Sequence, residues 1–437
     1  MKDHNALQSI LKYFKISDGK ILIGGKTAEE IAADVDTPFY AYDLSIAKKK
    51  YEMLSAALLS EVEIHYAIKA NPHPEIVKFF SQLGTGFDVA SAGELNIVLA
   101  TGVDPKRIGF AGPGKREEEI RFACRAGIGS LNVESTGELD LANRIAAEEE
   151  KQLNVCLRVN PSYELTGSGM KMGGGSKQFG IDQEIIPDVL RRFDDWPHLS
   201  FRGFHIFAGS QNLNAEAISS AFEKAIDAVL KFIPYCPQPP AMVNLGGFGI
   251  PYFLSDTELD IDVVGSAMKE IINARKSILD DVTLIVETGR YLVGECGVYV
   301  SRVLYRKESR GETFLIVDGG MHQHLAASGN LGQIIKKNYP IALPERIQGP
   351  PLEKVNIVGP LCTPLDRLGS KVALPKAKPG DLIAIFASGA YGFTASPRTF
   401  LGHPEPTEVI LFDISYEQPR MTRIITNKEK ILLKSRY

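Results

Sequence analysis

A single lysine at the end of a short apolar strand is the first residue whose position suggests chemistry. The run HYAIKAN (65–71) delivers Lys69 and is then broken by Pro72. Lysine is almost never fully buried unless it is paired, so a lysine in such a run stands out. When its surroundings disfavour the ammonium form, the amine becomes a nucleophile that forms Schiff bases with carbonyl compounds. A solvated charge is the alternative interpretation of one lysine taken alone.

A glutamate closes another strongly apolar strand and needs a partner there. Glu287 is followed by Thr288, Gly289 and Arg290 at the end of the run TLIVETGR. A buried carboxylate is costly unless it is paired. One candidate partner is the pyridine nitrogen of pyridoxal phosphate, the commonest carbonyl partner of a reactive lysine, because an ionised glutamate keeps that ring protonated and electron-accepting. Pairing with Arg290 or with the backbone is equally open.

Glycine-rich segments supply the remaining candidates. In LGGFG (245–249), Gly246 and Gly247 follow a strand and let backbone N–H groups approach a phosphate, although such turns are also ordinary structural features. Cys362 in VGPLCTP leaves a strand after Gly-Pro, where a thiol acts as a general acid or packs in a core. Tyr391 in SGAYG either reaches a ligand or packs.

Metal ions, nucleic acids and membranes are disfavoured as partners. His322 and His324 have no third ligand nearby, so we expect no metal site. The 437 residues carry a net charge of -4 and no basic run interleaved with aromatic residues, which argues against nucleic acid. Five scattered cysteines without a CxxC pair favour a reduced cytoplasm. No stretch approaches the ~18 apolar residues that span a membrane.

Eight short apolar runs alternate with amphipathic segments and must position these residues. Alternation of strand and helix eight times predicts an α/β fold, a (β/α)8 TIM barrel, although a doubly wound open sheet has the same periodicity. Polar residues at many strand ends favour the barrel; they are Lys69, Asp88, Asn160, Ser210, Gly246 and Glu287. The runs are HYAIKA (65–70), GFDVAS (86–91), IGFAGP (108–113), SLNVES (130–135), NVCLRVN (154–160), FRGFHIFAGS (201–210), MVNLGG (242–247) and TLIVETGR (283–290).

The sequence changes character after residue 290. Strand-like runs such as VYVSRVLYRKE, ETFLIVDGG and DLIAIFAS follow one another with turn-like links and little helix. This pattern of successive strands with short links predicts a separate, mostly antiparallel β domain. The early strand FYAYDL (39–44) precedes the barrel and is expected to pair with this β domain. We therefore expect a barrel over 45–290 and a β-rich domain over 1–44 and 291–437.

A series of motifs, in this order and spacing, resembles the barrel-type pyridoxal-phosphate decarboxylases, the alanine-racemase-like family of diaminopimelate and ornithine decarboxylases. The resemblance runs from about residue 38 to about residue 412 and implies pyridoxal 5'-phosphate as cofactor. It also implies a head-to-tail homodimer with shared active sites. The motifs are YAIKAN, FDVAS, AGPGK, NVES, LRVNP, AGSQ, NLGG, ETGRYLV, VDGGM, GPLC and SGAYG.

The resemblance implies a role for each matching residue. Lys69 resembles the lysine that binds the cofactor covalently, and Glu287 the partner of its pyridine nitrogen. Cys362 is similar to the cysteine that returns a proton to the substrate α-carbon, in relatives from the second subunit. Residues that resemble cofactor or phosphate contacts, or that support them, are Asp88, Arg158, His205, Ser210, Gly246, Gly247, Gly289, Arg290 and Tyr391.

The chain departs from the family pattern around the cofactor. The family places a ring-stacking histidine three residues before the serine of GSQ, whereas this chain has Phe207, which can also stack. His205 matches an earlier, less central residue. The usual three glycines of the phosphate loop are shortened to Gly246 and Gly247, and EPGR has become ETGR.

Two further departures concern the substrate. In diaminopimelate decarboxylases the cysteine is followed by a glutamate that reads the distal amine, whereas Cys362 is followed by Thr363. Those enzymes also carry an arginine-proline pair after VDGGM for the distal carboxylate, and this chain reads MHQHLAA (321–327). Because absent polar partners remove selectivity for charged groups, free diaminopimelate is a doubtful substrate.

The segments MKMGGGSKQFGID, GPLCTPLDRLG and YGFTASPRTFLGHPEP resemble instead the branch of the butirosin-pathway glutamyl-[acyl carrier protein] decarboxylase. We therefore expect decarboxylation of an L-amino acid presented by an acyl carrier protein or another large group. A diaminopimelate decarboxylase of lysine biosynthesis is the alternative. An amino-acid racemase and a non-catalytic cofactor-binding protein rank below both.

Overall fold

The chain forms two compact units, each described here by itself. The computed structural model describes residues 5–164, 170–171, 173–207, 209–253, 255–331, 333, 336–411 and 425–426. The barrel unit comprises the described residues of 52–250 and 259–291. The β unit comprises the described residues of 1–51, 251–258 and 292–437. The domain boundaries expected after residues 44 and 290 stay predictions.

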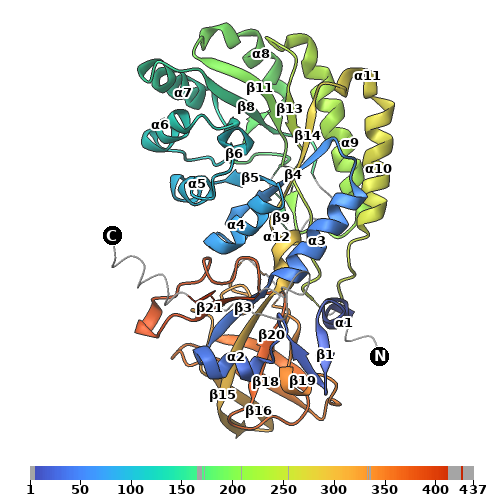
Figure 1. Ribbon diagram of the computed structural model, residues 1–437, viewed down its shortest axis with the longest axis vertical. Helices are drawn as coiled ribbons and strands as arrows, with labels where there is room; N and C mark the ends of the chain where they lie inside the picture. The colour runs from blue at the N-terminus through green and yellow to red at the C-terminus, as the bar shows by residue number, and fades with distance from the viewer. Residues whose placement is uncertain are drawn as a thin grey trace. The chain divides into compact units, whose positions relative to one another are not determined.

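Eight parallel strands close the predicted barrel (Figure 1). Because β14 pairs with β4 and β7 pairs with β8, the strands form a ring, which excludes the open doubly wound sheet. In ring order they are β4 (Val62–Ala67), β5 (Gly86–Val89), β6 (Ile108–Phe110), β7 (Ser130–Val133), β8 (Leu153–Asn160), β11 (Leu199–His205), β13 (Met242–Asn244) and β14 (Thr283–Thr288).

Amphipathic helices follow the strands and cover them (Figure 1). Each strand sends alternate side chains to opposite faces. Tyr66 of β4, for example, stacks on Phe80 of α4 at 4.3 Å between ring centroids. Serine caps start two of the helices, since Ser91 accepts from the N–H of Glu94 and Ser135 from that of Glu138. The helices are α4 (Pro74–Gln82), α5 (Ala92–Leu99), α6 (Glu117–Ala126), α7 (Thr136–Glu148), α8 (Ile186–Arg191), α9 (Ala215–Phe232), α10 (Ile261–Ala274) and α11 (Lys276–Leu279).

Seven of the eight predicted apolar runs extend past the observed strand, and only β8 ends where its run ends. The difference is largest at β11 and also moves Lys69 out of β4. Strand β4 stops at Ala67, and Lys69 lies in the following 3-10 turn Ile68–Ala70. Strand β11 stops at His205, and Ser210 belongs to β12 (Gly209–Ser210), which pairs antiparallel with β9 (Met170–Lys171). In both cases the backbone leaves the barrel before the apolar run ends, so Lys69 lies in a turn and Ser210 in a separate short strand.

The β unit contains the predicted, mostly antiparallel sheet. Strand β3 (Phe39–Asp43) pairs with β15 (Gly297–Ser309), as expected for FYAYDL, and also with β21 (Thr407–Leu411). The pairs β3–β21 and β16–β18 are parallel, and the other described pairs of this sheet are antiparallel. Its remaining strands are β16 (Glu312–Val317), β17 (Ile341–Ala342), β18 (Glu353–Val358), β19 (Arg367–Leu374), β20 (Leu382–Ile385) and β22 (Ile425–Thr426).

Smaller elements complete the description. A hairpin of β1 (Lys15–Ser17) and β2 (Lys20–Leu22) follows α1 (Asn5–Leu11), and α2 (Ala28–Val35) precedes β3. Helix α3 (Leu44–Ala57) follows β3, α12 (Arg290–Val293) follows β14 (Figure 1), and the short strand β10 (Ile181–Asp182) pairs parallel with β8. None of the helices in the described part of the chain is long and apolar enough to cross a membrane.

Candidate active site

Lys69 and Glu287 meet at the carboxyl ends of two neighbouring barrel strands. Strand β4 delivers Lys69, and β14, which pairs with it, carries Glu287. The Lys69 Nζ lies 3.0 Å from Glu287 Oε1. The lysine side chain is 42% exposed, whereas that of the glutamate is 2% exposed. The pair therefore combines a reachable amine with a buried anion.

Glu287 is held from its other side by β11 and β13. His205 Nε2 lies 3.0 Å from Glu287 Oε2, and the Asn244 amide donates to the same oxygen at 3.5 Å. Burial acts to raise the pKa of Glu287, but the charge of Lys69 and the hydrogen bond from His205 outweigh it and hold the pKa well below its usual range. Glu287 is thus a permanently ionised carboxylate inside the barrel.

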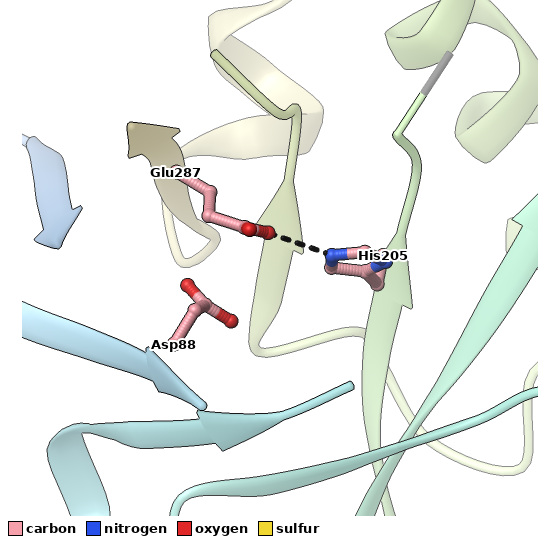
Figure 2. A group of neighbouring side chains, drawn as sticks. All are labelled: Asp88, His205 and Glu287. Carbon is pink, nitrogen blue, oxygen red and sulfur yellow. Dashed lines mark hydrogen bonds and ion pairs between the residues drawn. The ribbon is translucent and has the colours of Figure 1, made fainter. Parts of the chain in front are cut away.

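Asp88 completes a cluster of three buried side chains that converge from three strands (Figure 2). Ligand-type atoms of Asp88, His205 and Glu287 lie within 4.8 Å of one another. Burial and the nearby charge of Glu287 raise the pKa of Asp88. We assign this cluster to an organic cofactor, because Lys69, an amine that can bind a carbonyl compound, lies 3.0 Å from Glu287.

An aromatic pair lies beside the cluster. The rings of His205 and Phe207 are parallel to within 6°, with centroids 6.4 Å apart. Lys69 Nζ is 5.4 Å from the centroid of the Phe207 ring. Phe207 therefore presents an aromatic face next to the lysine amine, at the position where the family pattern has a histidine.

The two glycines of the LGGFG turn allow a close backbone approach. Gly246 has φ +78°, and a Cβ there would lie 2.9 Å from the Phe207 ring. A Cβ at Gly247 would lie 2.1 Å from the carbonyl oxygen of Glu287. Asn244 fixes the turn by accepting from the Gly246 N–H at 3.1 Å. A side chain at Gly247 would push this turn away from β14, and one at Gly246 would collide with the Phe207 ring.

Gly289 is another position where a side chain would collide with neighbouring backbone. A Cβ at this residue would lie 2.5 Å from the carbonyl oxygen of Ala67 at the end of β4. The glycine therefore lets the segment after Glu287 pass against the segment that carries Lys69. Arg290 follows it as the first residue of α12.

Arg158 has a different partner from those above. Its guanidinium donates to Glu134 at 2.6 Å and lies 4.8 Å from the centroid of the Phe179 ring. Glu134 follows β7 and also accepts the backbone N–H groups of Gly112 and Gly180. Arg158 therefore supports the site by fixing three neighbouring loops through one carboxylate.

The remaining predicted residues belong to the β unit. Cys362 follows β18 and is an exposed free thiol. Its loop is anchored by Asp366, which accepts the Leu361 N–H at 2.9 Å. Tyr391 follows β20 and has φ +55°, a left-handed conformation that non-glycine residues rarely adopt. Their participation in the barrel site stays a prediction.

Sequence reasoning missed four residues that hold the site. They are His65, Glu134, Asn244 and Asp366. Glu134 lies in the quoted motif NVES and Asn244 in NLGG, so their motifs were a usable signal. No sequence signal pointed to His65 or Asp366, because a histidine in an apolar strand or an aspartate in a turn is usually structural.

The described residues fit pyridoxal phosphate. Asp88 Oδ1 and His205 Nδ1 are buried without a hydrogen-bond partner among the described residues, and Asp88 Oδ2 has only His65 Nδ1, 3.4 Å away, as a charged neighbour in ion-pair contact. These atoms, with the anionic Glu287, suit the polar edge of an aromatic ring. The Gly246–Gly247 turn has no side chains to cover its backbone, as a phosphate-binding turn requires. Lys69 supplies the amine.

Comparison with known proteins gives a consistent result. Residues 45–294 match the family "Pyridoxal-dependent decarboxylase, pyridoxal binding domain". The L-glutamyl-[BtrI acyl-carrier protein] decarboxylase of Niallia circulans is 39% identical over 387 residues, 87% of this chain and 90% of that protein. The 2-[(L-alanin-3-ylcarbamoyl)methyl]-2-hydroxybutanedioate decarboxylase of Staphylococcus aureus is 32% identical over 85% of this chain and 93% of that protein.

A solved structure agrees with the fold. Diaminopimelate decarboxylase of M. jannaschii, crystallised with L-lysine, superposes with a TM-score of 0.83 at 28% identity, and the match covers 91% of this chain and 92% of that one. Fold, site chemistry and sequence relatives thus converge, and pyridoxal phosphate is the cofactor that all three imply. The chain belongs to the pyridoxal-dependent decarboxylases.

Proposed function

We propose that this decarboxylase removes the α-carboxylate of an L-amino acid whose side chain is attached to an acyl carrier protein or another large group. The observation that carries the proposal is the lack of charged residues for a free distal end. Thr363 stands where diaminopimelate decarboxylases have a glutamate, and its hydroxyl accepts the Leu365 N–H at 3.3 Å. A distal ammonium finds no carboxylate at this position.

The segment after Met321 supports the same conclusion for a distal carboxylate. His322 and His324 are fully buried. Burial lowers the pKa of His322 to about 4 and that of His324 to about 3, so both are neutral near pH 7. Neither residue therefore replaces the missing arginine as a cation.

The relatives favour a conjugated substrate. The Niallia circulans enzyme is named for a glutamyl group on an acyl-carrier protein, and the Staphylococcus aureus enzyme for an alanin-3-yl group joined through a carbamoyl link. In both names the amino acid carries a large substituent on its side chain, and in the second name that substituent is a hydroxybutanedioate, which carries two carboxylates. Diaminopimelate decarboxylation is the second candidate, because the superposed M. jannaschii enzyme has that activity by name.

We assign the barrel residues to binding and orientation. When bound, pyridoxal phosphate supplies an electron-accepting ring that stabilises the electron pair left on the α-carbon as CO2 departs. Lys69 binds the cofactor covalently, and its amine is oriented by Glu287 at 3.0 Å. Glu287 faces the ring nitrogen, and Phe207 offers an aromatic face. The turn at Gly246 and Gly247 receives the phosphate.

Other groups act on the substrate and on the phosphate side. Cys362 gives a proton to the substrate α-carbon after CO2 has left. Ser210, Gly289, Arg290 and Tyr391 complete the cofactor contacts that the family pattern implies. Asp88 and Arg158 support them through His65 and Glu134.

We further propose a homodimer in which each subunit contributes Cys362 to the partner's site. We place the protein in the reducing cytoplasm, because its five cysteines are free. Sedimentation of the cofactor-loaded protein tests the first proposal. Mixing a Lys69→Ala protein with a Cys362→Ala protein tests the sharing: mixed dimers recover activity if the sites are shared, and stay inactive if each site uses one chain.

The substrate proposal is tested by CO2 release from a panel. The panel contains free diaminopimelate, lysine, ornithine, arginine and glutamate beside glutamate tethered to an acyl carrier protein. We expect release from the tethered substrate alone. Release from free diaminopimelate would mean that other residues replace the missing distal contacts and would refute the proposal. A chiral assay on alanine and lysine separates a racemase.

A further inference from the structure

A histidine inside the barrel lies directly below the lysine that carries the chemistry. His65 is on β4, four residues before Lys69, and is 6% exposed. The next residue, Tyr66, packs outward on Phe80. Because side chains alternate along a strand, His65 points to the opposite face, the interior of the barrel. In the proposed function this residue is only a contact of Asp88, and no effect on Asp88 is assigned to it.

The neighbouring strands leave room for the His65 ring. Gly86 of β5 is its register partner, and a Cβ there would lie 2.2 Å from His65 Nε2. One strand further, a Cβ at Gly109 of β6 would lie 2.9 Å from Asp88 Oδ1. Any side chain at either glycine would thus displace His65 or Asp88. The two glycines make a cavity shaped for this pair.

Both ring nitrogens of His65 face carboxylates. Nδ1 lies 3.4 Å from Asp88 Oδ2, and Nε2 lies 3.5 Å from Glu63 Oε2. Only the protonated ring carries N–H groups on both nitrogens. Burial acts to lower the pKa of His65, but Asp88 and Glu63 outweigh it and raise the pKa to about 9. The ring is therefore an imidazolium at neutral pH.

The charges around this imidazolium come from four elements. Glu63 precedes it on β4 and also lies 3.7 Å from Arg107. Asp88 faces it from β5, and Glu287 of β14 is its other register partner. His205 of β11 contacts Glu287. His65 is the cation in ion-pair contact with Asp88. Lys69 is the corresponding cation for Glu287.

Two buried carboxylates this close do not both stay ionised without cations, because one of them takes up a proton. A protonated Asp88 would act as a hydrogen-bond donor next to Glu287 and would compete for its oxygens. That competition would weaken the hold of Glu287 on a ring nitrogen.

We infer that His65 is a positioning residue of the decarboxylase site, whose imidazolium keeps Asp88 ionised and oriented so that Glu287 remains a free anion for the cofactor. The inference rests on the proposed roles of Lys69 and Glu287 and adds a residue that acts through Asp88. It requires no contact between His65 and the substrate.

The direct test needs no substrate. The cofactor-loaded protein is labelled with 13C at Cε1 of its eight histidines, and the titration of each is followed by NMR from pH 5.5 to 10. His65 is identified by the signal lost in His65→Gln. We expect it to titrate above pH 8 and to fall by about one unit or more in Asp88→Asn, because an opposite charge at this distance shifts a pKa by ~1–3 units. Should His65→Gln fail to fold, the signal that moves in Asp88→Asn identifies the residue.

A kinetic double-mutant cycle provides the second readout. With the substrate that the panel identifies, the acid limb of kcat/KM in His65→Gln should move to higher pH by about one unit or more, since Asp88 then protonates more readily. His65→Gln should add no further shift in the Asp88→Asn background. His198→Gln, the same change at a half-buried histidine before β11, serves as the control and should shift nothing.

Two results would overturn the inference. One is a His65 signal that titrates near or below its ordinary range; the other is a His65→Gln shift of equal size with and without Asp88. Because the NMR titration involves no turnover, it also separates this inference from the proposed function. A protein that releases no CO2 from the tethered substrate but shows the coupled titration refutes the substrate and supports His65.

Discussion

A methyl group added at Gly247 is expected to weaken cofactor binding strongly. The residue lies in the turn after β13, and an added Cβ would be 2.1 Å from the carbonyl oxygen of Glu287. Contacts under 3.0 Å are essentially never seen for real Cβ atoms. Its neighbour here is backbone on a central barrel strand, which cannot rotate away as a side chain can. The turn itself must therefore move.

The size of the effect follows from two costs. Overpacking a well-packed site costs about 1–3 kcal/mol. Moving the turn also stretches the hydrogen bond from the Glu287 N–H to the Gly246 carbonyl, 3.0 Å long, which contributes about 0.5–1.5 kcal/mol. If the displaced turn is the one that receives the phosphate, a total of about 1.5–4.5 kcal/mol raises the Kd for pyridoxal phosphate roughly 10- to 1,600-fold.

The assay is a titration of the cofactor-free protein with pyridoxal phosphate, followed by absorbance. Gly137→Ala is the matched control, because this glycine of α7 has nothing within 4 Å of an added Cβ. The control should keep the parental Kd and gain about 0.5–1 kcal/mol of helix stability, since alanine is the better helix former. Circular dichroism checks that both variants are folded.

An unchanged Kd in a folded Gly247→Ala protein would refute the reasoning. It would mean that the turn between Gly246 and Phe248 does not contact the phosphate, or that β14 yields to the added methyl group. Equal weakening in Gly137→Ala would be as damaging, because that site offers no steric reason for any effect.

Three shorter predictions complete the set. Lys69→Ala should abolish turnover and leave no cofactor attached after borohydride reduction, as judged by protein mass; full activity contradicts its role. Cys362→Ala should impair decarboxylation or divert it to transamination, visible in the products, and an unchanged product spectrum and kcat would exclude the thiol. Because its pKa is raised to about 9, His65 stabilises the fold fully below about pH 6.5 and loses this contribution as the pH rises through 9. The stability advantage of the parent over His65→Gln, measured by denaturant unfolding, should therefore shrink by roughly 3 kcal/mol between pH 6 and pH 10, and an advantage independent of pH would contradict the ion pair.

The barrel was predictable because its signals are local. Each strand is a short apolar run, and each following helix repeats its apolar residues every three or four positions. Parallel strands gather their carboxyl ends at one face, so Lys69 and Glu287 could be expected together without any knowledge of register. Their charged atoms lie 3.0 Å apart.

The interior of the site was not predictable in the same way. Whether His65 meets Asp88 depends on the register of β4 against β5 and on the absence of a side chain at Gly86. These are relations between strands, and a single sequence gives no measure of them. The same holds for Glu134, which joins Arg158 to two loops. The ends of β4 and β11 were also missed, because apolar composition continues past the point where pairing stops.

This chain departs from the diaminopimelate decarboxylase pattern in both units, but the departures in each unit are of a different kind. Those that concern the substrate, at Thr363 and after Met321, lie in the β unit. The barrel unit keeps its charged groups, and its main change, Phe207, retains an aromatic face beside Lys69. Under the proposed function, chemistry and substrate choice are therefore carried by different parts of the chain. We infer from this division that a conjugated substrate requires the loss of charges in the β unit, while Lys69, His65 and their two carboxylates in the barrel are kept.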